Sequence, residues 1–557
     1  MVNDSNKKIK IISAVATVII AVAVLVYIGP PSVLQTAFVA GAGPEIQVFG
    51  SGQEETTIQR GTEVVNTNES SVRNGIRYVK IEAETKTDGK SETVAYYIDE
   101  RNLSDDINGV VQEKEVYVRT PATIYENESG AGIAGFAHKG TKLKVESYDK
   151  ILDNGVVNRY EVSCPDNEDV SNGYIYGKYV VMTQDEADEY YNENGEYDKA
   201  KKSRYHMELY AGRGEDLDYY PCERPDIEGN EFCREARGMY LNWAAAMQAD
   251  KYIELIEETD CNAVVIDIKD GILAYKSPVA KELSPTSYKH AANTVEEYQK
   301  QVNKFKDAGV YTIGRIACFT DESYAKDNPE DCIKAGNTVI GWPSAFSRDA
   351  WYYNVSLAIE GVELMGFNEI QFDYVRFPER TYELSKAGNT DFRNKYGEDK
   401  AQAIQNFCFY ATDQIHEAGA YFSVDVFGEC SDGYVAAYGQ YWPAISNVVD
   451  AISSMPYTDH YGRDVDTWSN PKGIMKMWAE NAARSQKQIP TPAVARTWIT
   501  GYNTPHWNPT VNYDTEKLKV QVDALYEAGL DGGFIPWHSG SSLEKYRQYK
   551  EIWNYKH

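Results

Sequence analysis

The sequence predicts a multidomain fold, with an N-terminal transmembrane helix, two small all-β barrels and a C-terminal α/β domain that forms a TIM (β/α)8 barrel. Three observations lead to this prediction. The chain has 557 residues, which is too long for one hydrophobic core. An uncharged apolar run lies near its start. In the C-terminal part, a helix pattern, a glycine and a strand pattern recur together at Gly309, Gly366, Gly419 and Gly529. The expected parts are a cytoplasmic tail (1–10), a transmembrane anchor (11–29), a first β domain (45–105), a second β domain (113–183), a linker or lid (184–235) and the barrel domain (236–557).

The predicted anchor, residues 11–29, contains no charged side chain. As a helix it would be about 28 Å long, close to the hydrocarbon thickness of a bilayer. Lys7, Lys8 and Lys10 precede it, and such positive charge stays on the cytoplasmic side. We therefore expect a single-pass protein of the cell membrane, with a cytoplasmic N-terminus and extracellular C-terminal domains. A cleaved signal peptide is the alternative.

Residues 45–105 and 113–183 share a pattern of short alternating strands separated by Gly, Asn and Asp turns. Through the runs 116–119 and 173–176, the second segment resembles bacterial SH3-like domains, and the first resembles them more weakly. The resemblance implies that these domains bind the cell wall; a plain spacer is the alternative. Residues 184–235 are rich in Asp, Glu and Tyr and lack clear periodicity, which is typical of a linker or an irregular lid.

The overall charge excludes one large class of partners. The formal net charge is −28, and a nucleic-acid-binding protein needs a basic surface instead. The chain contains no C-x-x-C, H-x-H or H-E-x-x-H motif. We therefore predict no metal site and no cofactor, and we disfavour a metal-dependent deacetylase that would use Asp267, Asp270 and a histidine.

The recurring helix–glycine–strand pattern predicts eight parallel strands. A doubly wound open sheet is the alternative, but no G-x-G-x-x-G motif follows the first strand. In a TIM barrel, the chemistry lies at the C-terminal ends of the strands. The predicted strands are 238–241, 263–268, 311–316, 369–375, 421–427, 451–454, 493–498 and 533–537.

Two carboxylates stand out at these strand ends. Asp373 lies in the apolar run 369–378, where an unpaired charge would be costly, and Asp425 lies in the next strand. Neighbouring strands are about 4.8 Å apart, so the two groups could raise one pKa while the other stays ionised. Such a pair performs glycoside hydrolysis. Glu429 and Asp267 are further catalytic candidates.

Other side chains at the strand ends are candidates for substrate binding. Arg376 or Arg315 could also hold the second carboxylate ionised, and Trp498 and Trp537 could form a platform for a sugar ring. The predicted substrate-binding residues are Arg376, Arg315, Lys269, Asp270, Tyr457, Trp498, Trp537 and His538.

From Arg237 onward, the chain resembles a bacterial family of glycosyl hydrolase domains, which are TIM barrels distantly related to alpha-amylase-like enzymes. Five runs carry the likeness: 238–241, 265–270, 370–378, 423–428 and 533–537. Alpha-amylase-like barrels carry their nucleophilic Asp on strand 4, where Asp373 stands. Their acid is a Glu after strand 5, whereas this chain has Asp425 within that strand and Glu429 just past it.

We therefore expect a membrane-anchored extracellular glycoside hydrolase that acts on a cell-wall or capsular polysaccharide by a two-carboxylate mechanism. Its expected partners are this polysaccharide, the membrane through residues 11–29 and the cell wall through the SH3-like domains. The alternative is a barrel without catalysis that binds carbohydrate or acts as a scaffold at the cell surface.

Overall fold

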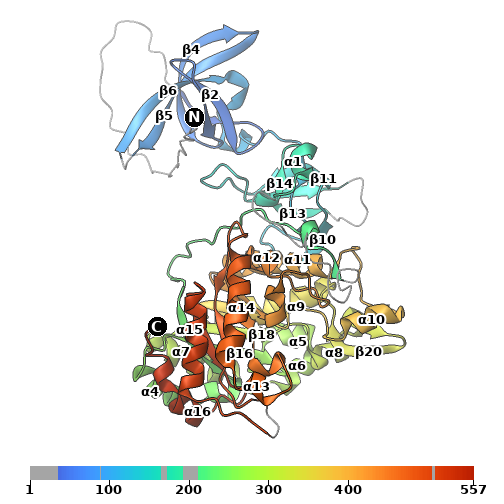
Figure 1. The fold of residues 1–557 in the computed structure, drawn as a ribbon. Helices are drawn as coiled ribbons and strands as arrows, with labels where there is room; N and C mark the ends of the chain where they lie inside the picture. The colour runs from blue at the N-terminus through green and yellow to red at the C-terminus, as the bar shows by residue number, and fades with distance from the viewer. Residues whose placement is uncertain (1–34, 88–89, 165–171, 192–210, 505–508) are drawn as a thin grey trace, which may run out of the picture. The chain divides into compact units, whose positions relative to one another are not determined.

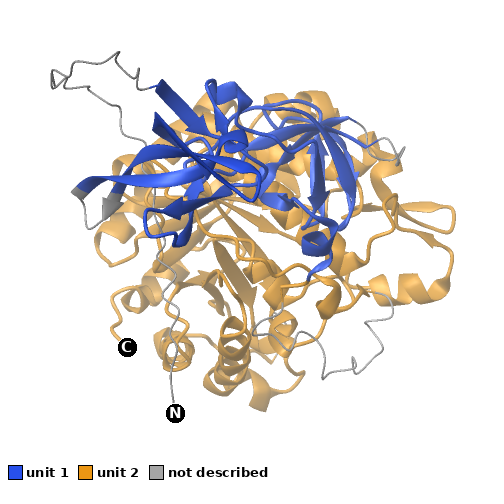
Figure 2. Ribbon diagram, turned by 90° about the horizontal axis from the view of Figure 1, so that it is seen from above, with its two compact units in different colours: residues 1–189 blue, residues 190–557 orange. Residues whose placement is uncertain are grey.

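The computed structural model describes residues 35–557 except 88–89, 165–171, 192–210 and 505–508 (Figure 1). The chain divides into two compact units, residues 1–189 and residues 190–557 (Figure 2).

The predictions of a transmembrane helix and of a single-pass membrane location require correction. Across the described ranges, no helix is both long and apolar enough to cross a bilayer. The longest of these helices, α11 (Lys400–Glu417), carries charged and amide side chains along its length. The segment 11–29, from which both predictions came, and the tail 1–10 lie outside the described residues.

The first sheet of unit 1 has seven antiparallel strands within the described residues, in the order β3-β2-β6-β5-β4-β1-β7. Alternation explains its core, because Ile46 and Val48 of β2 point inward while their neighbours face solvent. The sheet extends beyond the predicted range 45–105, since β1 pairs with β4 and β7. The strands are β1 (Gln35–Val39), β2 (Glu45–Gly50), β3 (Glu55–Gln59), β4 (Glu63–Arg73), β5 (Ile76–Thr87), β6 (Lys90–Asp99) and β7 (Leu103–Ser104).

The second sheet of unit 1 has seven strands in the described part of residues 113–183, in the order β10-β9-β13-β12-β11-β8-β14. The helix α1 (Gln184–Asp188) follows it, capped by Thr183. Unit 1 is thus β-rich, while its likeness to SH3 domains stays a prediction. The strands are β8 (Glu115–Val118), β9 (Ala122–Tyr125), β10 (Ile133–Ala137), β11 (Lys142–Tyr148), β12 (Arg159–Ser163), β13 (Gly173–Tyr176) and β14 (Val180–Val181).

A buried ion pair joins the two sheets of unit 1. Arg60, which follows β3, contacts Glu113, which precedes β8, at 2.7 Å, and both side chains are almost fully buried. Arg60 also donates to the carbonyl of Gly155 at 3.0 and 3.2 Å, and the Tyr160 hydroxyl donates to Glu113. These bonds satisfy both charges, as buried ions require.

Unit 2 is a nearly closed barrel of nine parallel strands among the described residues, in the order β25-β24-β23-β21-β18-β16-β15-β27-β26. The strands are buried on both faces, as in other parallel sheets covered by helices. They are β15 (Ala236–Leu241), β16 (Ala263–Asp270), β18 (Tyr311–Ala317), β21 (Glu369–Asp373), β23 (Tyr421–Phe427), β24 (Ala451–Met455), β25 (Val494–Ala495), β26 (Thr497–Thr500) and β27 (Gly533–Trp537).

The structure differs from the predicted eight-strand barrel at residues 493–498, where one strand was expected and two short strands are found. In place of one strand, β25 pairs with β24 and β26 pairs with β27. The change of partner occurs at Arg496, whose fully buried guanidinium contacts Glu369 of β21 at 2.6 Å. The two short strands β25 and β26 therefore follow one another in the chain but lie at the two ends of the strand order, so no single regular strand closes the barrel.

The predicted glycines do end the helices that precede the strands. For example, the π-helical turn η6 (Gly361–Met365) ends at Gly366, whose φ of 66° lies in the left-handed region. The helices of unit 2 are α3 (Trp243–Ala246), α4 (Ala249–Glu257), α5 (Pro278–Leu283), α6 (Pro285–His290), α7 (Val295–Asp307), α8 (Glu322–Asp327), α9 (Arg348–Glu360), α10 (Thr381–Ala387), α11, α12 (Trp442–Ser446), α13 (Val465–Trp468), α14 (Pro471–Gln486), α15 (Thr515–Glu527) and α16 (Leu543–Gln548).

Four short strands in the described part of unit 2 lie outside the order of the barrel strands. β17 (Ile272–Leu273) pairs with the end of β16. A separate small antiparallel sheet consists of β19 (Cys332–Ala335), β20 (Thr338–Pro343) and β22 (Thr390–Asp391). Its strands come from the segments that follow β18 and β21, so it lies on the side of the barrel where the C-terminal strand ends meet.

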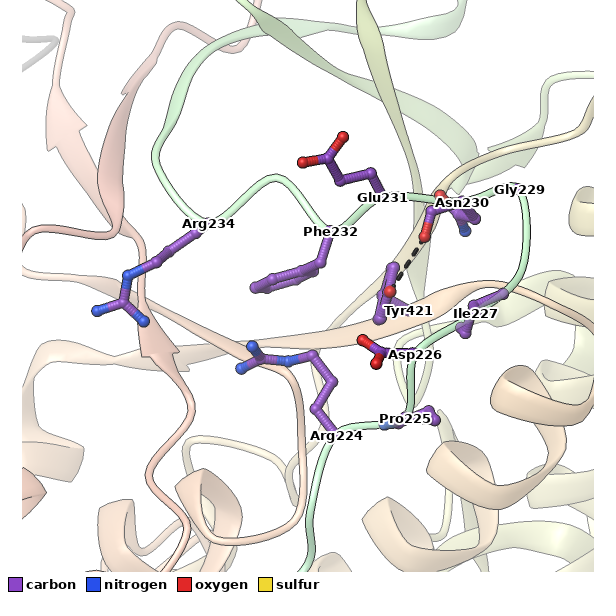
Figure 3. Close-up of a pocket in the computed structure, with 10 residues that line it drawn as sticks. All are labelled: Arg224, Pro225, Asp226, Ile227, Gly229, Asn230, Glu231, Phe232, Arg234 and Tyr421. Carbon is purple, nitrogen blue, oxygen red and sulfur yellow. Dashed lines mark hydrogen bonds between the residues drawn. The ribbon is translucent and has the colours of Figure 1, made fainter. Parts of the chain in front are cut away.

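Residues 211–235 of the predicted linker or lid pack against the barrel. Asn230 donates to the carbonyls of Asn368 and Gly419, which precede β21 and β23. A pocket of about 620 Å³ opens here, and Figure 3 shows Tyr421 donating to the Asn230 carbonyl inside it. Because Tyr421 begins β23, this pocket lies at the N-terminal ends of the strands, opposite the expected site of catalysis.

Candidate active site

Arg315, near the end of β18, is the centre of the candidate active site. In the described part of the chain, it contacts four carboxylates. Its Nη1 lies 2.6 Å from Asp267 and 3.0 Å from Asp270, its Nη2 lies 2.5 Å from Asp373, and its Nε lies 3.7 Å from Asp425. These groups come from β16, β21 and β23, whose C-terminal ends meet at one mouth of the barrel.

Strand β21 carries polar side chains into the barrel at every second position. Glu369 contacts Arg496, Gln371 donates to Ser453, and Asp373 reaches Arg315. The other face of the strand is apolar, since Phe372 stacks on Phe407 of α11 at a centroid distance of 5.6 Å. The two carboxylates of β21 are therefore both paired with arginine side chains inside the barrel.

Asp425 and Asp373 lie in different environments. Burial raises the pKa of Asp425 well above its ordinary value, the nearby Asp373 raises it further, and Arg315 opposes both effects. The Trp498 indole donates to Asp425 at 2.7 Å. Asp373 accepts bonds from Arg315 and, at 2.6 Å, from the Tyr374 amide. Asp425 is thus suited to hold a proton, whereas Asp373 lies against two hydrogen-bond donors.

Asp267 supports this arrangement from β16. Its second oxygen accepts a bond from the Tyr240 hydroxyl at 2.5 Å. Burial raises the pKa of Asp267 to about 6, although Arg315 lowers it. Asp270 is the most open member of the cluster, with a side chain that is 39% exposed.

The aromatic residues at the mouth pack around Arg315. Trp537 lies 4.4 Å from Tyr240 and 6.5 Å from Tyr457 between ring centroids. The Arg315 guanidinium lies 5.6 Å from the Trp537 ring. Trp537 is partly exposed, whereas Tyr457 and Trp498 are buried, so of the predicted platform residues Trp498 and Trp537 only Trp537 presents a ring at the mouth.

Several predicted site residues lie away from Arg315. Trp498 is buried and fixes Asp425, so it offers no platform. Glu429, in the turn η7 (Gly428–Asp432), accepts bonds from Tyr434 at 2.5 Å and Tyr438 at 3.0 Å. His538 follows β27, and its ring lies 6.3 Å from Tyr546.

Lys269, a predicted substrate-binding residue, points away from Asp267, although the two residues are only two positions apart in β16. The pairing of β16 with β18 shifts register between them, as at a β-bulge. Lys269 is therefore buried against Asp321 at 2.8 Å and Asn354 at 2.9 Å. Arg376 is likewise buried, among the rings of Trp342, Tyr374 and Phe427.

Four further residues near the site were not predicted from the sequence: Tyr240, Trp342, Tyr374 and Phe427. Tyr240 could have been found from alternation, because it lies on the inward face of the first strand. Tyr374 directly follows Asp373. Nothing in the sequence places Trp342 at the mouth, since its strand β20 belongs to a long excursion after β18. As for metals, the described residues contain no group of three or more His, Cys, Asp or Glu with ligand geometry.

A parallel barrel with neighbouring carboxylates at the C-terminal ends of its strands is an arrangement that glycoside hydrolases use. The chain belongs to the family described as "Putative glycosyl hydrolase domain", which matches residues 238–543. The family resemblance noted in the sequence is thereby confirmed, and so is the prediction of a glycoside hydrolase.

Solved structures of similar proteins include a hypothetical protein from Ruminiclostridium thermocellum ATCC 27405. It is 31% identical over 34% of this chain and 97% of that chain, with a TM-score of 0.28. The glycoside hydrolase domain of PgaB (BpsB) from Bordetella bronchiseptica is 13% identical, over 58% of this chain and 99% of that one, with a TM-score of 0.41. The spore cortex-lytic enzyme SleL from Bacillus cereus is 12% identical, over 58% and 75%, with a TM-score of 0.34. No curated protein matches the chain.

Proposed function

We propose that this protein hydrolyses glycosidic bonds in a polysaccharide, with Asp373 and Asp425 as its two carboxylates. The observation that carries the proposal is the shared contact with Arg315, at 2.5 and 3.7 Å. Groups bound to one guanidinium lie within the roughly 9.5 Å that glycoside hydrolases allow between their carboxylates.

Asp425 is the proposed general acid. It gives its proton to the glycosidic oxygen as the bond from this oxygen to the anomeric carbon breaks, and the leaving sugar departs as an alcohol. The raised pKa of Asp425 keeps this proton available above the pH at which an ordinary Asp loses it.

Asp373 is the proposed nucleophile or base. It either attacks the anomeric carbon, giving a glycosyl ester that water then cleaves, or takes a proton from the water that attacks. Arg315 donates to Asp373 and would stabilise its charge in either case. Glu429 is the second candidate for the general acid, because it follows β23, the strand that carries Asp425.

The polysaccharide that we propose is one of the bacterial cell wall or capsule. The resemblance of residues 113–183 to SH3-like domains supports this choice, because such domains occur on cell-wall proteins. A negative net charge of 28 fits a neutral or cationic glycan better than a polyanionic one.

The test is release of reducing ends from a panel of purified wall and capsular polysaccharides. We expect Asp373→Asn to lower the rate at least 1,000-fold, roughly 4 kcal/mol of transition-state stabilisation. The control is Asp307→Asn, at an exposed position of α7, which should match the parent. Equal activity of Asp373→Asn and the parent would refute the assignment.

One observation favours a second candidate function, a barrel that binds carbohydrate without cleaving it. Asp425 is only 1% exposed, and a general acid must reach the glycosidic oxygen. In that case the parent would retain a glycan in a pull-down assay and release no reducing ends, and Asp373→Asn would bind as the parent does.

A further inference from the structure

Three partly exposed aromatic side chains surround Arg376 beside Asp373. Trp342 comes from β20 of the small sheet, Tyr374 follows β21 directly, and Phe427 ends β23. The Arg376 guanidinium carbon lies 5.2, 4.9 and 4.3 Å from their ring centroids, in that order. Segments that are far apart in the sequence thus bring their rings to one place.

Arg376 serves as the inner support of this group. The side chain is buried, with 3% of the residue exposed, so a bound sugar would meet the rings before the guanidinium. The Trp342 indole donates to the Arg376 carbonyl at 3.3 Å, and Arg376 contacts Glu379 at 3.3 Å. A cation on the inner faces of aromatic rings holds them in place by cation–π attraction.

Tyr374 links these rings to the catalytic carboxylate. Its backbone has a φ of 54°, which is uncommon for a bulky residue and is maintained where the surrounding structure requires it. This conformation lets the Tyr374 amide donate to Asp373 at 2.6 Å while the ring meets Arg376. Burial raises the pKa of the Tyr374 hydroxyl, and the nearby charges of Asp373 and Asp270 raise it further.

The rings form a corner rather than a flat core. Those of Trp342 and Tyr374 are 6.2 Å apart with an interplanar angle of 65°, and Phe427 packs edge-on against Tyr438 at 5.2 Å. All three residues are partly exposed, so a ligand can reach this group from solvent.

We infer that Trp342, Tyr374 and Phe427 form a subsite that stacks one pyranose ring of the polysaccharide next to Asp373. This inference rests on the proposed function for the identity of the polymer. Axial C–H groups of a pyranose pack on an aromatic face, and the nearby Asp270 accepts hydrogen bonds from sugar hydroxyls. Arg376 is a positioning residue, which acts through the rings.

The experiment uses the full chain carrying Asp373→Asn, so that binding is measured without turnover. The probes are tetrasaccharides to hexasaccharides prepared from wall peptidoglycan and from capsular polysaccharide, titrated by calorimetry. We expect Trp342→Leu to weaken binding about tenfold, because Leu keeps the apolar contact with Arg376 and removes the stacking face. Trp342→Ala should weaken binding at least as much.

Tyr555→Ala is the control, since Tyr555 is another partly exposed ring in unit 2, 5.4 Å from Lys519, and it should leave binding unchanged. In the active parent background, Trp342→Leu should raise KM for the polymer and leave kcat within twofold. Unchanged affinity in a folded Trp342→Leu variant overturns the subsite, whatever the activity of Asp373→Asn. A fall in kcat with unchanged KM also overturns it, because that result indicates a purely structural role. Full activity of Asp373→Asn refutes the proposed function instead.

Discussion

The single guanidinium of Arg315 contacts four carboxylates, so Arg315 determines how the negative charge at the barrel mouth is arranged. Its planar donors reach three of these groups within 3.0 Å. A lysine has a point charge on a flexible stem and cannot reproduce this fork.

We expect Arg315→Lys to lower kcat/KM on the polysaccharide about 100-fold, because Asp373 and Asp425 then lose the guanidinium that contacts both of them. The measurement is steady-state kinetics, with Arg484→Lys on the exposed side of α14 as the control. A variant that keeps parental kcat/KM would show that the guanidinium does not organise the two carboxylates.

Asp267 gives a prediction for the pH dependence of stability. Its folded pKa of about 6 lies above the ordinary value of 3.8. The folded state therefore binds more protons between these values, and stability from this group is present below pH 4 and lost as the pH rises through 6. Relative to Asp267→Asn, the parent should lose up to about 3 kcal/mol over this range. Denaturant unfolding at pH 4 and pH 7 measures this change, and a constant difference between the two proteins would contradict it.

At the residue scale, the sequence predicted the members of the site better than their roles. Asp373, Asp425, Asp267, Asp270 and Arg315 were candidates because they lie at the predicted C-terminal strand ends, and the structure brings these five side chains together while their roles stay a prediction. Trp498 was predicted as a sugar platform but is buried against Asp425, because the sequence does not distinguish an exposed tryptophan from a buried one. Lys269 was predicted to bind substrate but points elsewhere, because the sequence gives no sign of the β-bulge before it.

At the scale of elements, four of the strands were predictable, because a helix ends at a glycine (Gly309, Gly366, Gly419 or Gly529) shortly before the strand begins. Gly309 has a φ of 73°, and no atom lies within 4 Å of where a side chain would begin. Its requirement is therefore one of backbone conformation alone.

We expect Gly309→Ala to reduce the free energy of unfolding by about 1 kcal/mol, and Gly309→Asn by less, since Asn tolerates the left-handed region. Chemical denaturation of the three proteins provides the comparison. If Ala and Asn were equally harmless, the conformational role of this glycine would be disproved.

The division of the seventh strand could not be predicted, because it depends on the pairing of Arg496 with Glu369 across the barrel. Both residues are fully buried, and each has further partners, such as Ser423 on Glu369 at 2.5 Å. We expect Arg496→Met to destabilise unit 2 by about 3–5 kcal/mol, because it leaves Glu369 charged and unpaired. The double variant with Glu369→Gln should recover part of the loss, and a double variant as unstable as the sum of both changes would argue against direct pairing.

At the scale of the whole molecule, unit 1 contains two sheets that share the Arg60–Glu113 contact. We expect the parent unit 1 to unfold in one transition and Glu113→Gln to lower its stability, because Arg60 then lacks its carboxylate. Hydrogen exchange of the strands in both sheets of Glu113→Gln tests this expectation. If exchange accelerates in neither sheet, the Arg60–Glu113 ion pair does not stabilise the two sheets.

The division of the chain into β-rich and barrel parts followed from sequence period, since strands that alternate every two residues differ from helix–strand repeats. The predictions of a membrane anchor and of a membrane location rested on the apolar run 11–29 and on the lysines before it. Both require correction, because no helix of the described residues is long and apolar enough to cross a bilayer. The joint at Arg60 was not foreseen, since its partners are separated by 53 and 95 residues.

The most direct test of the two-carboxylate assignment compares the polysaccharide with a dinitrophenyl glycoside of the same sugar, whose leaving group needs no proton. The account predicts that Asp425→Asn loses at least about 1,000-fold on the polysaccharide but stays within about tenfold of the parent on the glycoside, whereas Asp373→Asn fails on both. Asp425→Asn failing equally on both substrates, or Asp373→Asn cleaving either at the parental rate, would contradict it.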